Sequence, residues 1–374
     1  MLIPRILQQE IESVLFKNKV ILIFGARQVG KTTLLREIQK KYPDNSVYLN
    51  CDEPDIRASF TNATSTALGA LIKGKKLVLL DEAQRVNNIG LTLKLMVDNF
   101  SEIQVIATGS SAFELSSKTV EPLTGRKHEF FLFPFSVEEL KQVKPAFELK
   151  RLLPQMMIYG LYPEVEEKSG DAENIVKDLA RSYSYKDVLQ YQGIRNPELL
   201  EKLLQAVALQ IGNEVSYNEL GRVVGANRIT VMNYLNILEK AFIIFRLRPY
   251  SRNQRKELSK MHKIYFYDTG IRNALISNFN PLQMRADAGA LWENFWISER
   301  IKNNNNRARD VNKYFWRTYS QQEVDYVEEA GGKLHGFECK WSESKKAKVP
   351  SEWAALYSTA DYQIVTPDSF FDEL

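Results

Sequence analysis

Residues 20–32, VILIF followed by GARQVGKT, decide the fold of the first part of this sequence. The apolar run Val20–Phe24 predicts a buried strand, and Gly25 to Thr32 match the pattern G-x-x-x-x-G-K-S/T. Between a strand and a helix, this pattern forms a loop whose backbone N–H groups surround a phosphate. The sequence therefore predicts a phosphate-binding loop that opens a helix over about residues 31–40.

The residues of this loop have distinct expected roles. Lys31 reaches the β- and γ-phosphates, and the Thr32 hydroxyl binds Mg²⁺, so ATP and Mg²⁺ are the expected cofactors. The residues expected to contact the nucleotide are Gly25, Ala26, Arg27, Gln28, Val29, Gly30, Lys31, Thr32 and Thr33.

Polar residues follow two further apolar strands. Short apolar runs at 47–49, 77–80 and 104–107 alternate with helical stretches, which predicts an α/β domain with a parallel sheet covered by helices on both faces. We expect Asp81 to hold the metal, directly or through water, and Glu82 to polarise the attacking water. Ser110 is expected to sense the γ-phosphate or to position water.

Composition excludes several classes of protein. The chain has 374 residues, of which 44% are hydrophobic and 26% charged, with a net charge of +4. These values exclude wholesale disorder, collagen-like structure and coiled coil. No apolar run approaches the ~20 residues of a membrane-spanning helix, so no membrane association is expected. Cys51 and Cys339 form no disulfide framework, which favours a cytoplasmic location.

Changes of pattern along the chain predict four domains. The P-loop ATPase core is expected over residues 1–135 and a helical lid over 136–198. A winged helix-turn-helix is expected over 199–284 and a C-terminal α/β domain over 285–374.

Residues 216–267 predict the winged helix-turn-helix. A helix from Ser216 to Val224, a Gly-Ala-Asn turn and a helix over 228–240 form the helix pair, and strands at 242–246 and 263–267 form the wing. The residues expected to contact DNA are Asn227, Arg228, Thr230, Arg246, Arg248, Arg252, Arg255, Lys256 and Lys260, with Lys263 adding to the basic charge of the wing. A solvated face or a contact with the ATPase core would give the same pattern.

Gly331-Gly332 predicts the turn of a hairpin in the last domain. In that register Asp325 lies opposite Glu338, and Glu323 opposite Lys340. Opposed carboxylates on one face of a hairpin lie near enough to share a divalent cation. A hairpin whose charged residues only face solvent would have a similar sequence pattern.

A resemblance to a known family adds to these interpretations. The runs GARQVGKTTLL (25–35), LVLLDEAQRV (77–86), IATGSSAFEL (106–115) and PLTGRKHEFFLFPFS (122–136) resemble prokaryotic AAA-superfamily ATPases of the Orc-like branch that carry a C-terminal domain of unknown function. The resemblance extends to GLYPEV (160–165), YFYDTG (265–270) and GALWENF (289–295). It implies that Arg126 acts in trans on a neighbouring subunit's nucleotide, and hence a homo-oligomer.

The C-terminal pattern D-x₁₂-E-x-K resembles the PD-(D/E)xK nuclease superfamily. This implies a restriction-endonuclease-like fold in which Asp325 and Glu338 hold Mg²⁺ and Glu293 supports the metal shell. Lys340 would orient the water or stabilise the phosphorane charge. Having this fold does not imply cleavage, and a degenerate copy that only binds DNA remains an alternative.

The sequence thus predicts an ATP-hydrolysing DNA-binding or DNA-processing protein, with a possible metal-dependent nuclease activity. The alternative is an ATP-binding switch whose nuclease-like domain binds DNA or a protein partner without cleavage.

Overall fold

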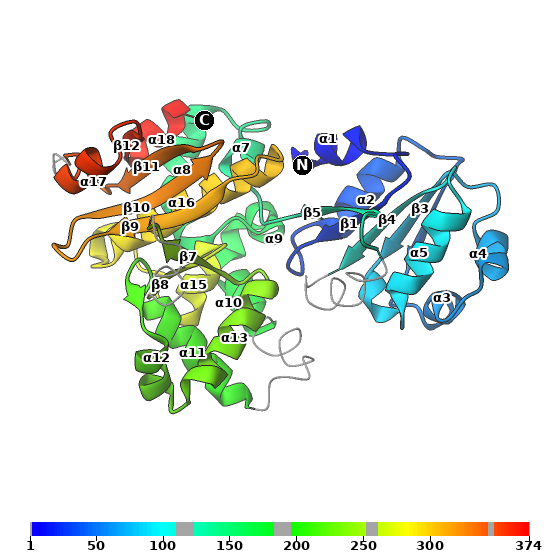
Figure 1. Ribbon diagram of the computed structural model, residues 1–374, viewed down its shortest axis with the longest axis horizontal. Helices are drawn as coiled ribbons and strands as arrows, with labels where there is room; N and C mark the ends of the chain where they lie inside the picture. Colours follow the sequence, from blue (N-terminus) through cyan, green and yellow to red (C-terminus); the bar gives the residue numbers. More distant parts are fainter. Residues whose placement is uncertain (1, 110–122, 183–195, 252–260, 343–347, 374) are drawn as a thin grey trace. The chain divides into compact units, whose positions relative to one another are not determined.

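A computed structural model describes residues 2–109, 123–182, 196–251, 261–342 and 348–373. The chain forms two compact units (Figure 1). The N-terminal unit comprises residues 4–134 with 240–242, and the C-terminal unit comprises mainly residues 135–239 and 243–374.

The N-terminal unit is built on a five-stranded parallel sheet of order β2-β3-β4-β1-β5. Its strands are β1 (Val20–Phe24), β2 (Ser46–Asn50), β3 (Leu77–Asp81), β4 (Gln104–Gly109) and β5 (Lys127–Phe131). Every residue of β1, β3 and β4 is buried, as continuous apolar runs indicate. The sheet confirms the predicted α/β fold of this unit, with the strand β5 in addition.

Five described helices pack with this sheet and its connections. They are α1 (Leu7–Ser13), α2 (Lys31–Gln39), α3 (Pro54–Phe60), α4 (Ser65–Leu71) and α5 (Ile89–Asn99). Helix α2 contacts β2 and β3, and α5 contacts β4. Since β1, β3 and β4 are parallel neighbours in the order β3-β4-β1, the loops that follow them meet at one edge of the sheet.

The C-terminal unit contains one seven-stranded mixed sheet of order β12-β11-β10-β9-β7-β8-β6. The strands are β6 (Glu214–Val215), β7 (Ile244–Pro249), β8 (His262–Phe266), β9 (Asn312–Arg317), β10 (Glu323–Ala330), β11 (Lys333–Cys339) and β12 (Asp361–Val365). Parallel pairing of β7 with β9 joins the two halves of the sheet. The segments predicted as lid, helix-turn-helix and C-terminal domain therefore lie in one compact unit.

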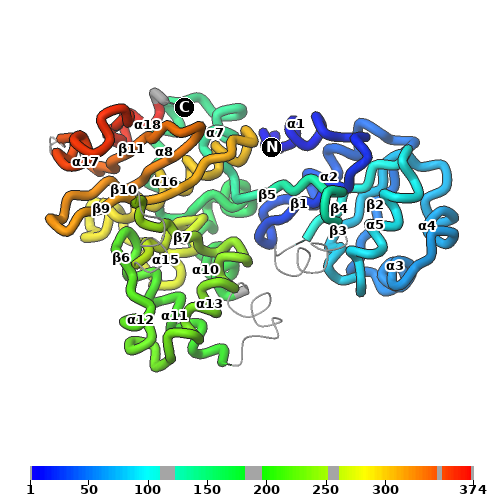
Figure 2. Tube along the Cα trace, in the orientation of Figure 1, coloured from blue at the N-terminus to red at the C-terminus, as the bar shows by residue number. Residues whose placement is uncertain are grey.

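Several helices of this unit contact strands of the sheet (Figure 2). The longest helices described in the unit are α8 (Ala146–Tyr159), α10 (Ala172–Ser182), α11 (Pro197–Leu209), α13 (Arg228–Lys240) and α16 (Ala288–Asn306). The shorter ones include α7 (Val137–Leu140), α9 (Pro163–Glu167), α12 (Tyr217–Val224), α15 (Thr269–Leu275), α17 (Ser351–Leu356) and α18 (Pro367–Glu373). None of the helices in the described ranges is both long and apolar enough to cross a membrane.

Two of the runs that carry the family resemblance, GLYPEV and YFYDTG, contact each other in this unit. Gly160 ends α8 with φ +76°, and a Cβ there would lie 1.9 Å from Oδ1 of Asp268. The Asp268 carboxylate accepts from the N–H of Leu161 at 2.8 Å and from the N–H of Ile271, in the first turn of α15, at 3.2 Å. Only glycine fits at position 160. The run GLYPEV therefore has a structural role, because its backbone contacts the aspartate that caps α15.

Candidate functional site

The loop between β1 and α2 has the backbone shape that its sequence predicts. Gly30 adopts φ +96°, a left-handed conformation that favours glycine, at the N-cap of α2. A Cβ on Gly25 would lie 2.2 Å from the carbonyl oxygen of Leu132, so close packing excludes a side chain there. No side chain caps α2, which leaves the N–H groups of its first turn available to a phosphate.

Lys31 points its ammonium into this loop. Its side chain is buried, and Nζ donates to the carbonyl oxygens of Gly25 and Ala26, each at 2.8 Å. These contacts hold a positive charge at the centre of the curve formed by the loop. Val29 is fully buried and Ala26 nearly so, which means that these two residues present backbone rather than side chains.

Asp81 is the meeting point of three hydroxyl groups. Its carboxylate is 3% exposed and ends β3. Oδ2 accepts from Thr32 at 2.6 Å and from Tyr48 at 2.7 Å, and Oδ1 accepts from Thr108 at 2.5 Å. A threonine at the start of the helix and an aspartate at the end of a neighbouring strand are the two protein groups that hold Mg²⁺ in P-loop NTPases, so these residues fit that ion.

Glu82 follows Asp81 in a left-handed conformation with φ 52°. Its N–H donates to Oγ1 of Thr108 at 3.1 Å, and its Oε2 accepts from Nε2 of Gln84 at 2.5 Å. Thr108 thus contacts both acidic residues. Sequence reasoning placed Asp81 and Glu82 but missed Thr108, which lies two residues before the expected Ser110 in the same run; Ser110 lies outside the described residues.

Tyr48 and Arg5 are two further residues that sequence reasoning missed. Burial and the hydrogen bond to Asp81 raise the pKa of Tyr48, and the Arg36 guanidinium lies 3.4 Å from its ring centroid. Arg5 is 9% exposed and donates to the carbonyl oxygens of Val29, at 3.1 Å, and Phe133, at 2.5 Å. An arginine within the apolar run LIPRIL was the available signal that this side chain contacts backbone.

Two other predicted residues of this unit, Arg126 and Thr33, lie at its surface. Arg126, before β5, is 42% exposed and forms an ion pair with Asp98 at 2.7 Å. Thr33 is exposed on α2. Cys51 is buried, and burial raises the pKa of its thiol to about 12, which agrees with a packing role.

The helix pair α12–α13 has the predicted turn. Gly225 is left-handed with φ +74°, and the Asn227 side chain caps α13 by accepting from the N–H of Thr230 at 2.8 Å. Asn227 and Arg228 are exposed at the start of α13, whereas Val231, Leu235 and Leu238 are buried. Strands β7 and β8 follow as an antiparallel pair, within a few residues of the predicted ranges.

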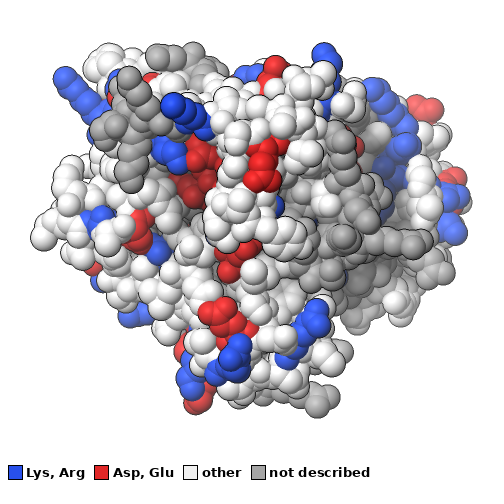
Figure 3. All heavy atoms as spheres, turned by 60° about the vertical axis from the view of Figure 1, so that its left-hand side comes forward, with Lys and Arg blue, Asp and Glu red and all other residues white. Residues whose placement is uncertain are grey.

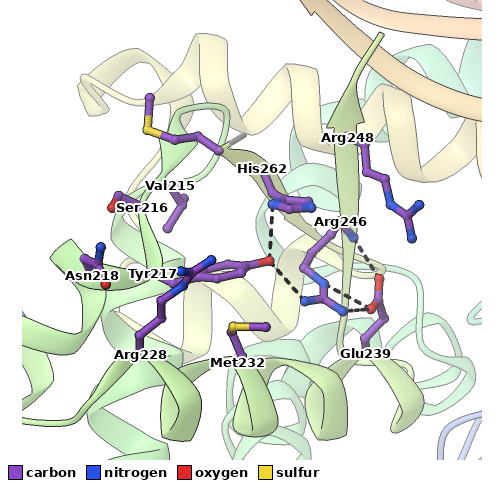
Figure 4. Close-up of a pocket in the computed structure, with 11 residues that line it drawn as sticks. Val215, Ser216, Tyr217, Asn218, Arg228, Met232, Glu239, Arg246, Arg248 and His262 are labelled. Atoms are coloured by element: carbon purple, nitrogen blue, oxygen red, sulfur yellow. Dashed lines mark hydrogen bonds and ion pairs between the residues drawn. The ribbon is translucent and has the colours of Figure 1, made fainter. Parts of the chain in front are cut away.

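A pocket of about 380 Å³ lies between these helices and strands (Figure 4). Its centre is Tyr217, whose ring stacks on His262 with centroids 5.4 Å apart and whose OH lies 3.2 Å from Nδ1 of His262. Burial and the charges of Arg246 and Arg248 lower the pKa of His262 to about 4. Exposed Arg228 and Arg248 border the same pocket.

The structure corrects the role predicted for Arg246. Its guanidinium forms an ion pair with Glu239 and donates to Asn236 at 2.7 Å and to the OH of Tyr217 at 3.1 Å. An arginine with these partners stabilises the helix–strand contact instead of offering a charge to DNA. The predicted residues Arg252, Arg255, Lys256 and Lys260 lie outside the described residues.

The C-terminal hairpin has the predicted register up to the pair Tyr326–Phe337. Beyond it, a shift in the pairing of β10 with β9 between Val324 and Val327 interrupts the regular ladder. Asp325 lies in this irregular stretch, and its Oδ2 accepts from the N–H of Cys339 at 2.8 Å. Glu338 and Lys340 form an ion pair with each other.

Lys263 lies beside two of the three carboxylates predicted to hold a metal in this unit, Glu293 and Asp325, whereas the third, Glu338, pairs with Lys340. Its Nζ is 3.2 Å from Oε1 of Glu293 and 3.8 Å from Oδ1 of Asp325, and it also forms an ion pair with Glu323. Burial alone would lower the pKa of Lys263, but the charges of these three carboxylates raise it above its ordinary value, so the ammonium persists at neutral pH. The expectation that Lys263 adds to a DNA-binding surface is therefore wrong.

This cluster does not fit a divalent cation. Within the described ranges of the chain, no group of three or more His, Cys, Asp or Glu side chains is arranged to hold a metal ion. An ammonium already lies within hydrogen-bonding distance of Glu293, and the side chain of Lys263 is 1% exposed.

Family models match three successive segments of the chain. Residues 17–141 match an AAA domain. Residues 150–282 match a domain of unknown function, DUF8612, and residues 288–369 match another, DUF4143. The first match agrees with the loop geometry and with the parallel sheet of the N-terminal unit.

Two relatives found by sequence similarity are uncharacterized proteins. An uncharacterized protein of Mycobacterium tuberculosis is 27% identical over 331 residues, covering 87% of this chain and 71% of that protein. An uncharacterized protein of Methanocaldococcus jannaschii is 28% identical over 284 residues, covering 70% of this chain and 64% of that protein. This chain thus spans less than two thirds of the second relative.

Two solved structures are distantly similar to this chain. Pif1 helicase from Candida albicans is 18% identical with a TM-score of 0.27, covering 41% of this chain and 44% of that one. Drosophila ORC bound to AT-rich DNA and Cdc6 is 10% identical with a TM-score of 0.25, and the match covers 72% of this chain and 92% of that one. At such scores the similarities support no conclusion about this chain.

Proposed function

We propose that the N-terminal unit binds ATP with Mg²⁺ and hydrolyses it. The observation that carries the proposal is the hydrogen bond of 2.6 Å between Thr32 and Asp81, beside a loop that holds the Lys31 ammonium. The loop N–H groups and Lys31 bind the phosphates, and Thr32 and Asp81 hold the metal, which neutralises charge on the phosphates. Glu82, oriented by Gln84, accepts a proton from the attacking water.

The test is ATP turnover by Lys31→Ala. This variant should lose turnover, because the charge at the centre of the loop is removed. Lys40→Ala is the matched control, since Lys40 lies at the other end of α2 with its side chain 68% exposed. Turnover by Lys31→Ala at the level of Lys40→Ala would refute the assignment of the site.

We further propose that Arg126 completes a neighbouring subunit's site in a homo-oligomer. Support comes from its exposed position at the turn before β5 and from its place in the run PLTGRKHEFF. In a mixture of Arg126→Ala and Lys31→Ala chains, turnover should recover at interfaces where an intact arginine meets an intact loop. Absence of recovery in mixtures shown to associate would contradict a role in trans.

DNA is the partner that we propose for the C-terminal unit. The order β6-α12-α13-β7-β8 supports a winged helix, in which α13 reads the major groove and the strand pair is the wing. Asn227, Arg228, Thr230 and Arg248 are the described residues proposed to contact it. On the face drawn in Figure 3, acidic and basic side chains are interspersed.

Salt dependence tests this proposal. Replacing Arg228 or Arg248 with Ala should weaken duplex binding and reduce the slope of log K against log salt by about 1 each. Arg309→Ala is the control, because Arg309 is an exposed arginine of the same unit outside the helix pair. Slopes equal to that of the unchanged chain would contradict the proposed contacts.

The second candidate function is an ATP-dependent switch that binds DNA or protein without cleaving it. The position of Lys263 within the carboxylate cluster favours it over a nuclease. Stimulation of turnover tenfold or more by DNA would indicate a motor or remodeller. Slow hydrolysis that DNA leaves unchanged would indicate the switch.

A further inference from the structure

The acidic cluster of the C-terminal unit draws its members from distant parts of the sequence. Glu293 comes from α16, and Glu323 and Asp325 from β10. Lys263 comes from β8, where it pairs with Leu247 of β7 and Glu214 of β6. The cation thus lies in the segment matched by one family model, and the carboxylates lie in the segment matched by the next.

Burial makes this arrangement demanding. The side chain of Lys263 is 1% exposed, that of Asp325 12% and that of Glu293 14%. A buried charge is tolerated only when it is paired and hydrogen-bonded, and an uncompensated one is strongly destabilising. Two largely buried acidic side chains, with the partly exposed Glu323 beside them, favour a cation at this place, and the Lys263 ammonium is placed to supply it.

Every carboxylate of the cluster also has a second partner. Glu293 accepts from the OH of Tyr265 at 2.5 Å, and Asp325 accepts from the N–H of Cys339. Glu323 lies 3.7 Å from Arg317, which itself pairs with Glu214 at 3.3 Å. Each of these three carboxylates thus has partners within the protein besides Lys263, whereas Oε2 of Glu338, the other predicted ligand, is buried and accepts no hydrogen bond.

We propose that Lys263 is the resident cation of this cluster, so that the C-terminal unit takes up no divalent cation there and cleaves no phosphodiester through it. The ammonium substitutes for a metal and ties β8 to β10 and α16. Oxygen ligands of this kind suit Mg²⁺, Mn²⁺ and Ca²⁺, which means that removal of the ammonium would expose a latent site for them.

Lys263→Met tests the proposal, because the methionine side chain is nearly as long as that of lysine and carries no charge. Unfolding of the nucleotide-free protein is followed by tryptophan fluorescence, since all five tryptophans lie in the C-terminal unit. Without metal, the variant should unfold at a temperature several degrees below the unchanged chain. Millimolar Mn²⁺ should restore most of the loss in the variant and leave the unchanged chain unaffected.

Two further variants serve as controls for the Lys263→Met experiment. Lys340→Met removes the other lysine of this region, which pairs with Glu338, and should gain no stabilisation from Mn²⁺. Adding Asp325→Asn to Lys263→Met should abolish the stabilisation. A Lys263→Met protein that Mn²⁺ does not stabilise would overturn the proposal.

The unchanged chain provides a measurement that does not depend on the variant folding. Electron paramagnetic resonance with Mn²⁺ as the probe should find no bound ion in the nucleotide-free protein. One tightly bound Mn²⁺ that is lost in Asp325→Asn would overturn the proposal. Mg²⁺-dependent cleavage of DNA that is lost in Asp325→Ala would overturn it as well.

Discussion

Replacing Thr108 with valine removes one hydroxyl group and leaves the volume of the side chain almost unchanged. Thr108 is fully buried in β4. Its hydroxyl donates to Oδ1 of Asp81 at 2.5 Å and accepts from the N–H of Glu82 at 3.1 Å. Valine can make neither bond, so one substitution loosens both acidic residues of the nucleotide site.

The magnitude follows from these two contacts. A hydrogen bond to a charged group contributes about 1.5–3 kcal/mol, and leaving a buried N–H unpaired costs about 1–3 kcal/mol. Asp81 keeps its bonds from Thr32 and Tyr48 on the other oxygen, which limits the loss. We expect the local stability around β3 and β4 to fall by about 3 kcal/mol, and ATP turnover to fall by about 10- to 100-fold as Glu82 loses its fixed position.

Hydrogen exchange of the β3 and β4 amides measures the stability, and phosphate release measures turnover. Thr108→Ser is the control, because serine keeps the hydroxyl. Tyr48→Phe is a second comparison and should have the smaller effect, since Thr32 still donates to the same oxygen of Asp81. Tryptophan fluorescence, which reports the C-terminal unit, should not change.

Turnover of Thr108→Val within twofold of Thr108→Ser would refute this reasoning. It would mean that neither Asp81 nor Glu82 depends on Thr108 for its catalytic position. Unchanged amide exchange in β3 and β4 would contradict the stability argument separately.

Two other perturbations test the C-terminal unit. Gly160→Ala should lower the free energy of unfolding by about 2–4 kcal/mol, because residue 160 has φ +76° and its Cβ would lie 1.9 Å from Oδ1 of Asp268. Gly170→Ala is the control and should change this free energy little, because a Cβ at residue 170 has no atom within 4 Å. Equal urea midpoints for the two variants would contradict the prediction. His262, whose pKa burial lowers to about 4, stays neutral in the folded state while the unfolded chain takes up a proton below about pH 6.5. Stability should therefore fall by about 2 kcal/mol, after allowance for solvent screening, as pH drops from 6.5 to 4, and His262→Gln should flatten this slope. A His262→Gln protein whose stability depends on pH as steeply as that of the unchanged chain would contradict this prediction.

The sequence predicts the N-terminal sheet well because its signals are local. The loop at residues 25–32 and the strand that ends in Asp81 are each contained in one short run. Tyr48 and Thr108 reach Asp81 from other strands, and no local pattern tells which polar residue of such a strand points to the carboxylate. Strand β5 (Lys127–Phe131) mixes polar with apolar residues, so it lacks the continuous apolar run of its neighbours.

In the C-terminal unit, the number of basic residues in a stretch of sequence does not tell which of them are exposed. Arg246 and Lys263 belong to a basic stretch in the sequence, but burial pairs them with Glu239 and with the acidic cluster. The hairpin register was predictable because the Gly331-Gly332 turn fixes it. The approach of Lys263 to Asp325 was not, because it depends on the strand order of a sheet assembled from residues far apart in the chain.

A crystal structure of the protein with Mg²⁺ and a non-hydrolysable ATP analogue tests the central claim most directly. The triphosphate should lie against the N–H groups of residues 25–32, with the metal between Thr32, Asp81 and the phosphates. An analogue bound elsewhere, or none bound at a saturating concentration, would contradict the account.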